Sequence, residues 1–277
     1  MNETDTMADR VLVLGGGLAG VACAQKLGDE GIDVVLVDRN DYHQFQPLLY
    51  QVASSQLPAE DIARPHRVIF ADYPSVTLVT AHVSAVTLSP PSLVLSDGQT
   101  LTGSHLVMAA GARPNFFGVP GAAEHAFPLY SVADAERLRV HLQHLLREAM
   151  AGRGSAEPGA LDVVVVGGGP TGVETTGALA ELMQALQSTG RLDTAGKITI
   201  VDRSSTLLGQ FSSKAHDYAR RRSCLTVLEV HHRQQQIDGL TERIERRLLW
   251  CPRLVGRSAG RCGSGCCEAN KNSSEPT

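Results

Sequence analysis

Two glycine-rich segments of nearly the same spelling constrain this chain more than any other feature. The first, VLVLGGGLAG, occupies residues 11–20, and the second, VVVVGGGPTG, occupies residues 163–172. Each begins with an apolar run typical of a buried parallel strand, and each leads into a segment with the pattern of a helix. A further strand follows each helix, which completes a βαβ unit. The chain is therefore predicted to be an α/β protein with two such units.

Both segments fit the pattern G-x-G-x-x-G, in which each glycine has its own task. The first permits a tight turn, the second lets a pyrophosphate approach the backbone, and the third lets the helix pack closely on the strand. The start of the helix adds unpaired N–H groups that favour phosphate. The candidate binding residues of the two motifs are Gly15, Gly17, Leu18, Ala19 and Gly20, and then Gly167, Gly169, Pro170, Thr171 and Gly172.

An acidic residue ends the strand that follows each motif. Asp38 lies 23 residues after Gly15, and Asp202 lies 35 residues after Gly167. A carboxylate at this point accepts hydrogen bonds from the ribose hydroxyls of a dinucleotide and repels a 2′-phosphate. We therefore expect two dinucleotides, one at each motif. The second is expected to be NADH rather than NADPH, although Arg203 follows Asp202.

The chain between the motifs has a different pattern. Short strand-like runs occupy residues 76–108, with a hairpin signal at Asp97-Gly98. An amphipathic helix is expected over 131–150, opened by a capping box of Ser131 and Asp134.

Three segments follow from these patterns. We expect a first nucleotide-binding domain over residues 1–155 and a second over 156–220, both Rossmann-like. The region 221–277 is expected to be irregular. Its composition differs from the rest, since the last 59 residues hold 11 of the 25 Lys and Arg residues and five of the six cysteines.

Several classes of protein are disfavoured by the sequence. The amino terminus, MNETDTMADR, is polar, with acidic residues ahead of its only arginine, so we expect no secretory signal and a cytoplasmic location. No metal is expected, because there is no H-E-x-x-H motif and no C-x-x-C pair. No nucleic acid is expected, because six acidic residues are interspersed among the basic residues near the carboxyl end.

Three stretches resemble a known family. They are DYHQFQPLLYQVASSQL at 41–57, LVMAAGARPNFFGVPGAAEHAFPL at 106–129 and VVVVGGGPTGVETTGALAEL at 163–182. They resemble the type II NADH dehydrogenases, above all the actinobacterial ones, which are FAD-dependent NADH:quinone oxidoreductases with a pyridine nucleotide-disulfide reductase-like fold. The resemblance implies FAD at the first motif, NADH at the second, and menaquinone or ubiquinone as acceptor at the inner face of the cell membrane.

The resemblance also implies roles for single residues. It places FAD against Asp38 and Arg39, the backbone of Val83, the turn at Ala110 and Gly111, and the segment from His43 to Gln51. It places Glu174 beside nicotinamide and flavin as the catalytic residue. From the residues alone, an acid near a helix start that complements the helix dipole is an equal alternative.

The resemblance covers about residues 10–220 and then stops. The family continues with a Gly-Asp turn, a quinone-site helix and an amphipathic membrane anchor, none of which follows Arg221. We therefore expect a truncation or frameshift near that residue, leaving both domains incomplete. The stretch LTERIERRLLWCPRLV, at 240–255, has the spacing of a short interfacial helix, but Pro252 ends it early. We therefore expect this chain neither to bind membranes stably nor to reduce a membrane quinone.

Alternatives stay open. A ferredoxin reductase-like enzyme uses the same pair of folds, and only the PLLYQVA segment argues against it. A disulfide reductase would need a cysteine pair near the flavin, whereas Cys23 stands alone. An inactive nucleotide-binding remnant is a further alternative for this chain. A homodimer is also compatible with the family resemblance.

Overall fold

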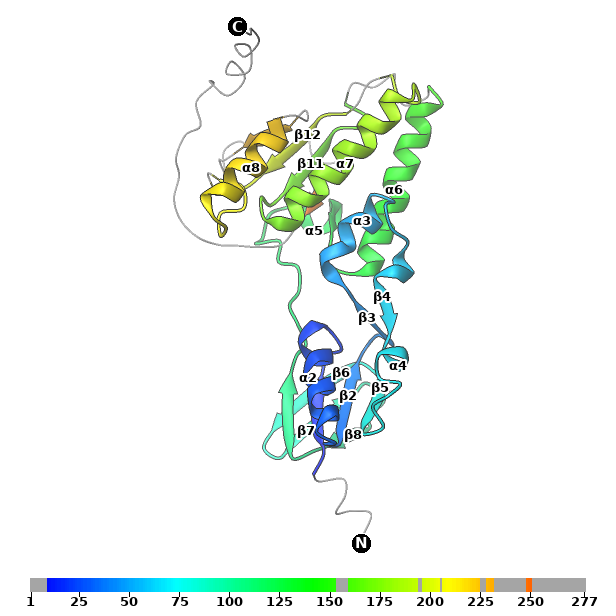
Figure 1. Cartoon of the computed structure of the whole chain (residues 1–277), viewed down its shortest axis with the longest axis vertical. Coiled ribbons are helices and arrows are strands. Elements are labelled where there is room, and N and C mark those ends of the chain that lie inside the picture. Colours follow the sequence, from blue (N-terminus) through cyan, green and yellow to red (C-terminus); the bar gives the residue numbers. More distant parts are fainter. Residues whose placement is uncertain are drawn as a thin grey trace, which may run out of the picture. The chain divides into compact units, whose positions relative to one another are not determined.

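The structure, a computed structural model, describes residues 9–152, 159–193, 196–204, 206–224, 228–231 and 248–250, with the backbone alone from Arg220 onward. These residues form two compact units (Figure 1). The first comprises the described residues up to Leu48 together with Pro58–Arg113. The second comprises Leu49–Leu57 and the described residues from Pro114 onward.

A parallel sheet with the strand order β5-β2-β1-β9 forms the centre of the first unit. Its strands are β1 (Val11–Leu14), β2 (Val34–Asp38), β5 (Val76–Thr80) and β9 (His105–Met108). Helix α2 (Leu18–Asp29) connects β1 to β2, which is the crossover expected from the sequence. Gly31 lies just beyond this helix with φ of +70°, a left-handed conformation that favours glycine and ends the helix there.

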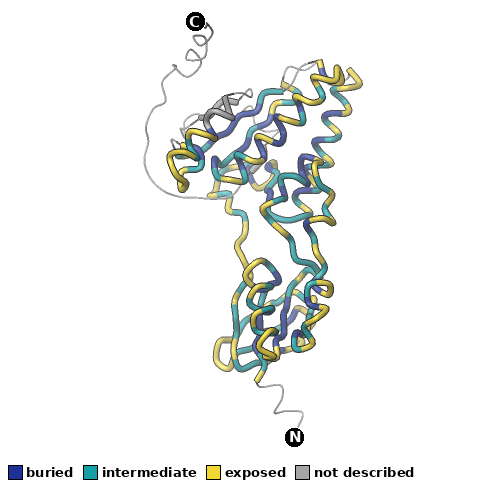
Figure 2. Tube along the Cα trace, viewed as in Figure 1, coloured by how far each residue is buried: buried dark blue, intermediate teal, exposed yellow. Residues whose placement is uncertain are grey.

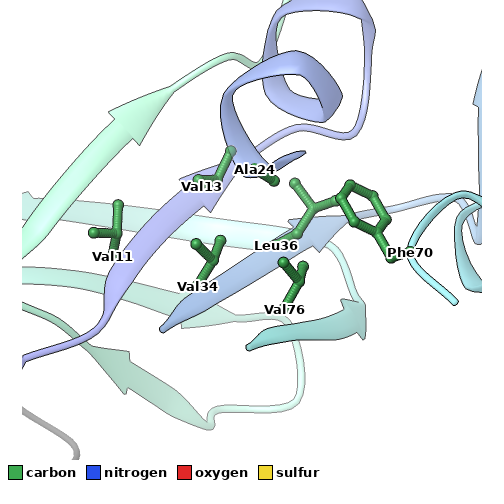
Figure 3. Packing of buried hydrophobic residues seen from close by; sticks show 7 residues of the cluster. All are labelled: Val11, Val13, Ala24, Val34, Leu36, Phe70 and Val76. Carbon is green, nitrogen blue, oxygen red and sulfur yellow. The ribbon is translucent and has the colours of Figure 1, made fainter. Parts of the chain in front are cut away.

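Both faces of this sheet are buried. On one face, seven apolar side chains pack between the strands and helix α2 (Figure 3): Val11, Val13, Ala24, Val34, Leu36, Phe70 and Val76. The other face packs on an antiparallel sheet of β6 (Val83–Leu88), β7 (Pro91–Leu95) and β8 (Thr100–Thr102). Burial on both sides explains why β1 and β2 are continuous apolar runs rather than alternating ones.

A short antiparallel pair completes the first unit. Strand β3 (Tyr42–Gln44) pairs with β4 (Ala63–Pro65), so that His43 lies opposite Arg64. The one-turn helix α4 (His66–Ile69) follows β4 directly. Single 3-10 turns occupy Gln46–Leu48 and Ala59–Asp61.

The second unit has its own parallel sheet, with the order β10-β14-β11-β12-β13. The strands are β10 (Ala126–Pro128), β11 (Val163–Val166), β12 (Ile198–Val201), β13 (Leu228–His231) and β14 (Leu248–Trp250). The helices are α3 (Leu49–Ala53), α5 (Ala122–His125), α6 (Val132–Met150), α7 (Pro170–Ser188) and α8 (Ser213–Cys224). Helix α3 packs against α6 and α7, and the buried residues of the unit lie along its strands and inward helix faces (Figure 2).

The capping box of helix α6 is confirmed. The hydroxyl of Ser131 accepts the backbone N–H of Asp134 at 3.1 Å, and the carboxylate of Asp134 accepts the N–H of Ser131 at 3.0 Å. The buried stripe of this helix is Ala135, Leu138, Leu142 and Leu146. Leu145 and Ala149 of this helix are only half-buried.

The compact units do not coincide with the segments expected from the sequence. Helix α6 belongs to the second unit, because it packs on α3 and β10, and that unit resumes at Pro114 rather than at 156. The assignment of 1–155 and 156–220 as nucleotide-binding domains stays a prediction.

The expectation of irregular chain after Arg220 is wrong for the end of helix α8, which runs to Cys224, and for two short strands. Strand β13 pairs with β12, and β14 lies between β10 and β11. Runs of four and three residues are too short to show a periodicity, and their partners are distant in the sequence. Residues 248–250, considered above as part of an interfacial helix, are therefore a strand. The rest of 240–255 lies outside the described residues.

No helix within the described ranges has the length and apolar character that a membrane span requires.

Candidate functional site

The turn after β1 can be made only by glycine. Gly15 has φ of +105°, and a Cβ atom there would lie 2.4 Å from the carbonyl oxygen of Ala109. A Cβ atom on Gly20 would lie 1.7 Å from the carbonyl oxygen of Gly15, which helix α2 approaches directly. Both contacts are far below any real Cβ distance, so these motif glycines are required by the close packing of strand, turn and helix.

The carboxylate of Asp38 is held by the first motif itself. Its Oδ2 atom accepts the backbone N–H of Gly16 at 2.5 Å, and its Oδ1 atom accepts that of Asn40 at 2.7 Å. Each carboxylate oxygen retains a further lone pair. The acid at the end of β2 is thus fixed beside the glycine turn and can still accept hydrogen bonds from ribose hydroxyls.

The start of helix α2 is uncapped and open. Gly17 is the N-cap, and no side chain caps the helix. A Cβ atom on Gly17 would meet nothing within 4 Å, and the first helical residue, Leu18, is 53% exposed. Ala19 follows in the same turn. Unpaired N–H groups facing open space fit a pyrophosphate.

The strand order reverses beside this turn. Strand β1 has β2 on one side and β9 on the other, and ligands of such sheets bind at this switch point. Ala109 donates its N–H to the carbonyl oxygen of Leu14 at 2.8 Å, which brings Ala110 next to Gly15. Gly111 follows with φ of +73°. The structure therefore places the predicted Ala110–Gly111 turn at the first motif.

The other residues predicted to contact FAD are spread more widely. Arg39 is exposed directly after β2, and Val83 begins β6 opposite Leu95. His43 lies in β3 of the first unit, whereas Gln51 lies in α3 of the second. The segment from His43 to Gln51 is thus divided between the two units.

One residue at this site was not found from the sequence. His66 is 5% exposed, and its Nε2 atom lies 3.1 Å from the carbonyl oxygen of Gly16. The Nδ1 atom of His43 contacts the same oxygen, also at 3.1 Å. No motif contains His66, and its position depends on the pairing of β3 with β4, which no local pattern indicates.

The second motif repeats the geometry of the first. Gly167 has φ of +115°, and a Cβ atom on Gly172 would lie 1.9 Å from the carbonyl oxygen of Gly167. Gly169 is the N-cap of α7, again without a capping side chain, and a Cβ atom there would meet nothing within 4 Å. Pro170 is the first helical residue, where its missing N–H costs nothing, and Thr171 follows.

The acid of the second motif is held in the same way. The two carboxylate oxygens of Asp202 accept the backbone N–H groups of Gly168 and Ser204, each at 2.5 Å. The carbonyl oxygen of Gly168 accepts the backbone N–H of Leu208 at 2.8 Å. The loop after β12 is therefore joined to the glycine turn by the Asp202 carboxylate and by the backbone of Leu208.

Glu174 lies on helix α7 at its fifth residue, beyond the first turn. This position weakens the alternative in which it only complements the helix dipole, since that effect fades beyond the first turn. The residue is exposed by surface area, yet desolvation by the surrounding protein raises the pKa of its carboxyl. Within the described chain, no hydrogen bond or ion pair holds that carboxylate.

Comparison with known proteins places this arrangement in a family. Residues 9–241 match the family described as pyridine nucleotide-disulphide oxidoreductase, and the chain belongs to that family. The match runs past Arg220, where the sequence resemblance was expected to stop. The expected fold class, with parallel sheets in a FAD/NAD-type arrangement, is confirmed.

Among its relatives is the type II NADH:quinone oxidoreductase Ndh of Mycobacterium tuberculosis, 32% identical over 95% of this chain and 60% of the relative. The type II NADH:quinone oxidoreductase of Staphylococcus aureus is 29% identical over 76% of this chain and 53% of the relative. These relatives confirm the resemblance stated above. The chain spans about 60% or less of their length.

Solved structures show the same fold. NDH2 from Plasmodium falciparum, in complex with RYL-552, has a TM-score of 0.72 at 18% identity, covering 88% of this chain and 55% of that one. A putidaredoxin reductase in covalent complex with putidaredoxin has a TM-score of 0.60 at 21% identity, covering 80% and 49%.

Proposed function

We propose that this chain is part of a FAD-dependent oxidoreductase that oxidises NADH and reduces a membrane quinone, menaquinone or ubiquinone. The observation that carries the proposal is the repeated geometry: two open helix starts, each with an acid bound to the second residue of its glycine motif. The reaction is proposed from the relatives, which are type II NADH:quinone oxidoreductases.

The first unit is proposed to hold FAD. The N–H groups at Gly17, Leu18 and Ala19 face the pyrophosphate, and Asp38 accepts from the adenosine ribose. The turn at Ala110 and Gly111 lies at the switch point beside Gly15 and supports the same ligand. Arg39, the Val83 backbone and His43 are also proposed to contact FAD. The contact expected of Gln51, which lies in the second unit, stays a prediction.

The second unit is proposed to hold NADH. The start of α7, from Gly169 to Thr171, binds the pyrophosphate, and Asp202 accepts from the ribose. A 2′-phosphate would meet the negative charge of Asp202 at close range, which favours NADH over NADPH. Arg203 is exposed and stands next to that carboxylate without contacting it in any described hydrogen bond.

Glu174 is proposed as the catalytic residue. NADH and FAD, when bound, supply the hydride-transfer chemistry. The protein orients both groups and excludes water. Desolvation raises the pKa of the Glu174 carboxyl. A carboxyl with a raised pKa is suited to holding or moving a proton near the reacting ring atoms.

The working enzyme is proposed to act at the inner face of the cell membrane, because its quinone is dissolved there, and a homodimer is a further part of the proposal. A ferredoxin-type acceptor is the alternative, favoured only by the shared fold of the reductases.

The test is a visible spectrum of the purified chain, followed by NADH oxidation with a menaquinone analogue and, in parallel, with a ferredoxin. We expect bound flavin and, for the whole enzyme of which this chain is proposed to be part, quinone reduction. Glu174→Gln should keep both nucleotides yet slow turnover at least about tenfold. Glu181→Gln, an exposed acid on the same helix, is the matched control. A chain without flavin overturns the proposal, and reduction of ferredoxin alone establishes the alternative.

A further inference from the structure

The peptide group between Gly16 and Gly17 is held from two directions by histidine side chains. The Nδ1 atom of His43 and the Nε2 atom of His66 each lie 3.1 Å from the carbonyl oxygen of Gly16. A carbonyl oxygen only accepts hydrogen bonds, so both ring nitrogens must carry a proton. The oxygen has two lone pairs, and the two histidines use both.

Fixing this carbonyl also fixes an N–H group that points the other way. In a planar trans peptide, the oxygen of Gly16 and the N–H of Gly17 lie on opposite sides of the bond. This peptide is trans, since the cis bond among the described residues is Ser89-Pro90. The Gly17 N–H is therefore turned away from the histidines. On the preceding peptide, the Gly16 N–H is bound to Asp38, so both peptides that flank Gly16 are held.

The same contact explains why residue 16 is glycine. It is not one of the three motif glycines, and its backbone is not in the left-handed region. A Cβ atom on Gly16 would lie 2.4 Å from both Cε1 and Nε2 of His66. The buried imidazole occupies the place that a side chain at residue 16 would take. His66 reaches this place because α4 begins directly after the β3–β4 pair, which also carries His43.

Among the residues that the structure describes, no side chain takes this place at the equivalent oxygen of the second motif. There, the backbone N–H of Leu208 donates to the carbonyl oxygen of Gly168 at 2.8 Å. The two motifs thus reach the same peptide orientation by different means. The first depends on two replaceable side chains, and the second depends on the backbone.

We propose that His43 and His66 are positioning residues for the dinucleotide pyrophosphate at the first motif. They act by orienting the Gly17 N–H toward the open space at the start of α2. The inference rests on the proposed binding of FAD there. Neither histidine needs to touch the pyrophosphate, because the peptide transmits the orientation.

The test is a titration of the flavin-free chain with FAD, followed by flavin fluorescence, for matched variants. His66→Leu and His43→Leu remove the donors, and each should weaken FAD binding about three- to tenfold. His66→Gln and His43→Asn keep an amide N–H near the lost Nε2 and Nδ1 atoms and should recover most of the affinity. His82→Leu, at an exposed histidine of the same unit, should change nothing.

A second readout separates positioning from general damage to the fold. NADH affinity should stay unchanged in all four variants of His43 and His66, because the second motif is held by Asp202 and Leu208 and by neither histidine. Equal losses of FAD and NADH affinity, or unchanged FAD affinity in both leucine variants, would overturn the inference. Gly16→Ala should weaken FAD binding less in a His66→Ala background than in the wild type, since the clash is then removed.

NMR of the imidazole nitrogens of His43 and His66 reports which of them carry a proton. This measurement distinguishes failure of the inference from failure of the proposed function. The histidine contacts require an N–H at Nδ1 of His43 and at Nε2 of His66 even without a ligand. A wild-type chain that binds no FAD would end the proposed function. An unprotonated Nδ1 on His43 would end the positioning role in either case.

Discussion

The carboxylate of Asp202 accepts the backbone N–H of Gly168, 34 residues before it in the chain, at 2.5 Å. The acid at the strand end therefore shapes the glycine turn before any ligand arrives. Asp38 and Gly16 repeat this relationship in the first unit. A single carboxylate thus serves both the turn and the proposed ribose contact.

Replacement of Asp202 by alanine should weaken NADH binding at least about tenfold, because a charged acceptor of two backbone N–H groups is lost. Asp202→Asn keeps one acceptor oxygen and should lose less. Isothermal titration with NADH measures both. Asp193→Ala, at an exposed acid of the same unit, is the control. Wild-type affinity in Asp202→Ala would exclude the role of this residue.

Two glycines of helix α7 should respond to alanine in opposite directions. A Cβ atom on Gly172 would lie 1.9 Å from a backbone oxygen, so Gly172→Ala should destabilise the protein by about 3 kcal/mol. A Cβ atom on Gly177 would meet nothing within 4 Å, so Gly177→Ala should stabilise it by about 0.5–1 kcal/mol. Urea denaturation measures both, and equal effects would contradict the packing described here.

Glu174 should make stability depend on pH. Desolvation raises the pKa of this carboxyl in the folded chain above its ordinary value of 4.5. Below that value the carboxyl is protonated in both the folded and the unfolded chain and does not change stability. As pH rises through the folded pKa, the carboxylate becomes charged and lowers the free energy of unfolding. Glu174→Gln should therefore raise the urea midpoint at neutral pH and leave it unchanged in acid. The effect should be small, because the side chain is exposed. A Gln variant less stable than the wild type at neutral pH would contradict the cause assigned to the shift.

The parts of the fold that follow from local chemistry were predictable. Continuous apolar runs indicate β1 and β11, and glycines at fixed spacing indicate the turns that follow them. Ser131 and Asp134, three residues apart, mark the start of α6. In each case the residues that determine the structure are neighbours in the sequence.

The parts that depend on distant partners were not predictable. Strands β3 and β14 have three residues each, and only pairing with remote segments makes them strands. His66 joins the site because β4 pairs with β3 and delivers it to Gly16, 50 residues earlier. Helix α3 lies in the second unit although the chain on both sides of it lies in the first. No local pattern contains this information.

The most direct test of the central claim, one dinucleotide at each motif, is to count bound FAD and NADH in the wild type and in Asp38→Ala. The visible spectrum after purification reports flavin, and isothermal titration reports NADH. The wild type should hold one equivalent of each, and Asp38→Ala should lose FAD while keeping its NADH affinity. Asp33→Ala, at an exposed acid near the start of the same strand, should behave as the wild type. Equal flavin content in Asp38→Ala and the wild type, or a wild type that binds neither nucleotide, would contradict the claim.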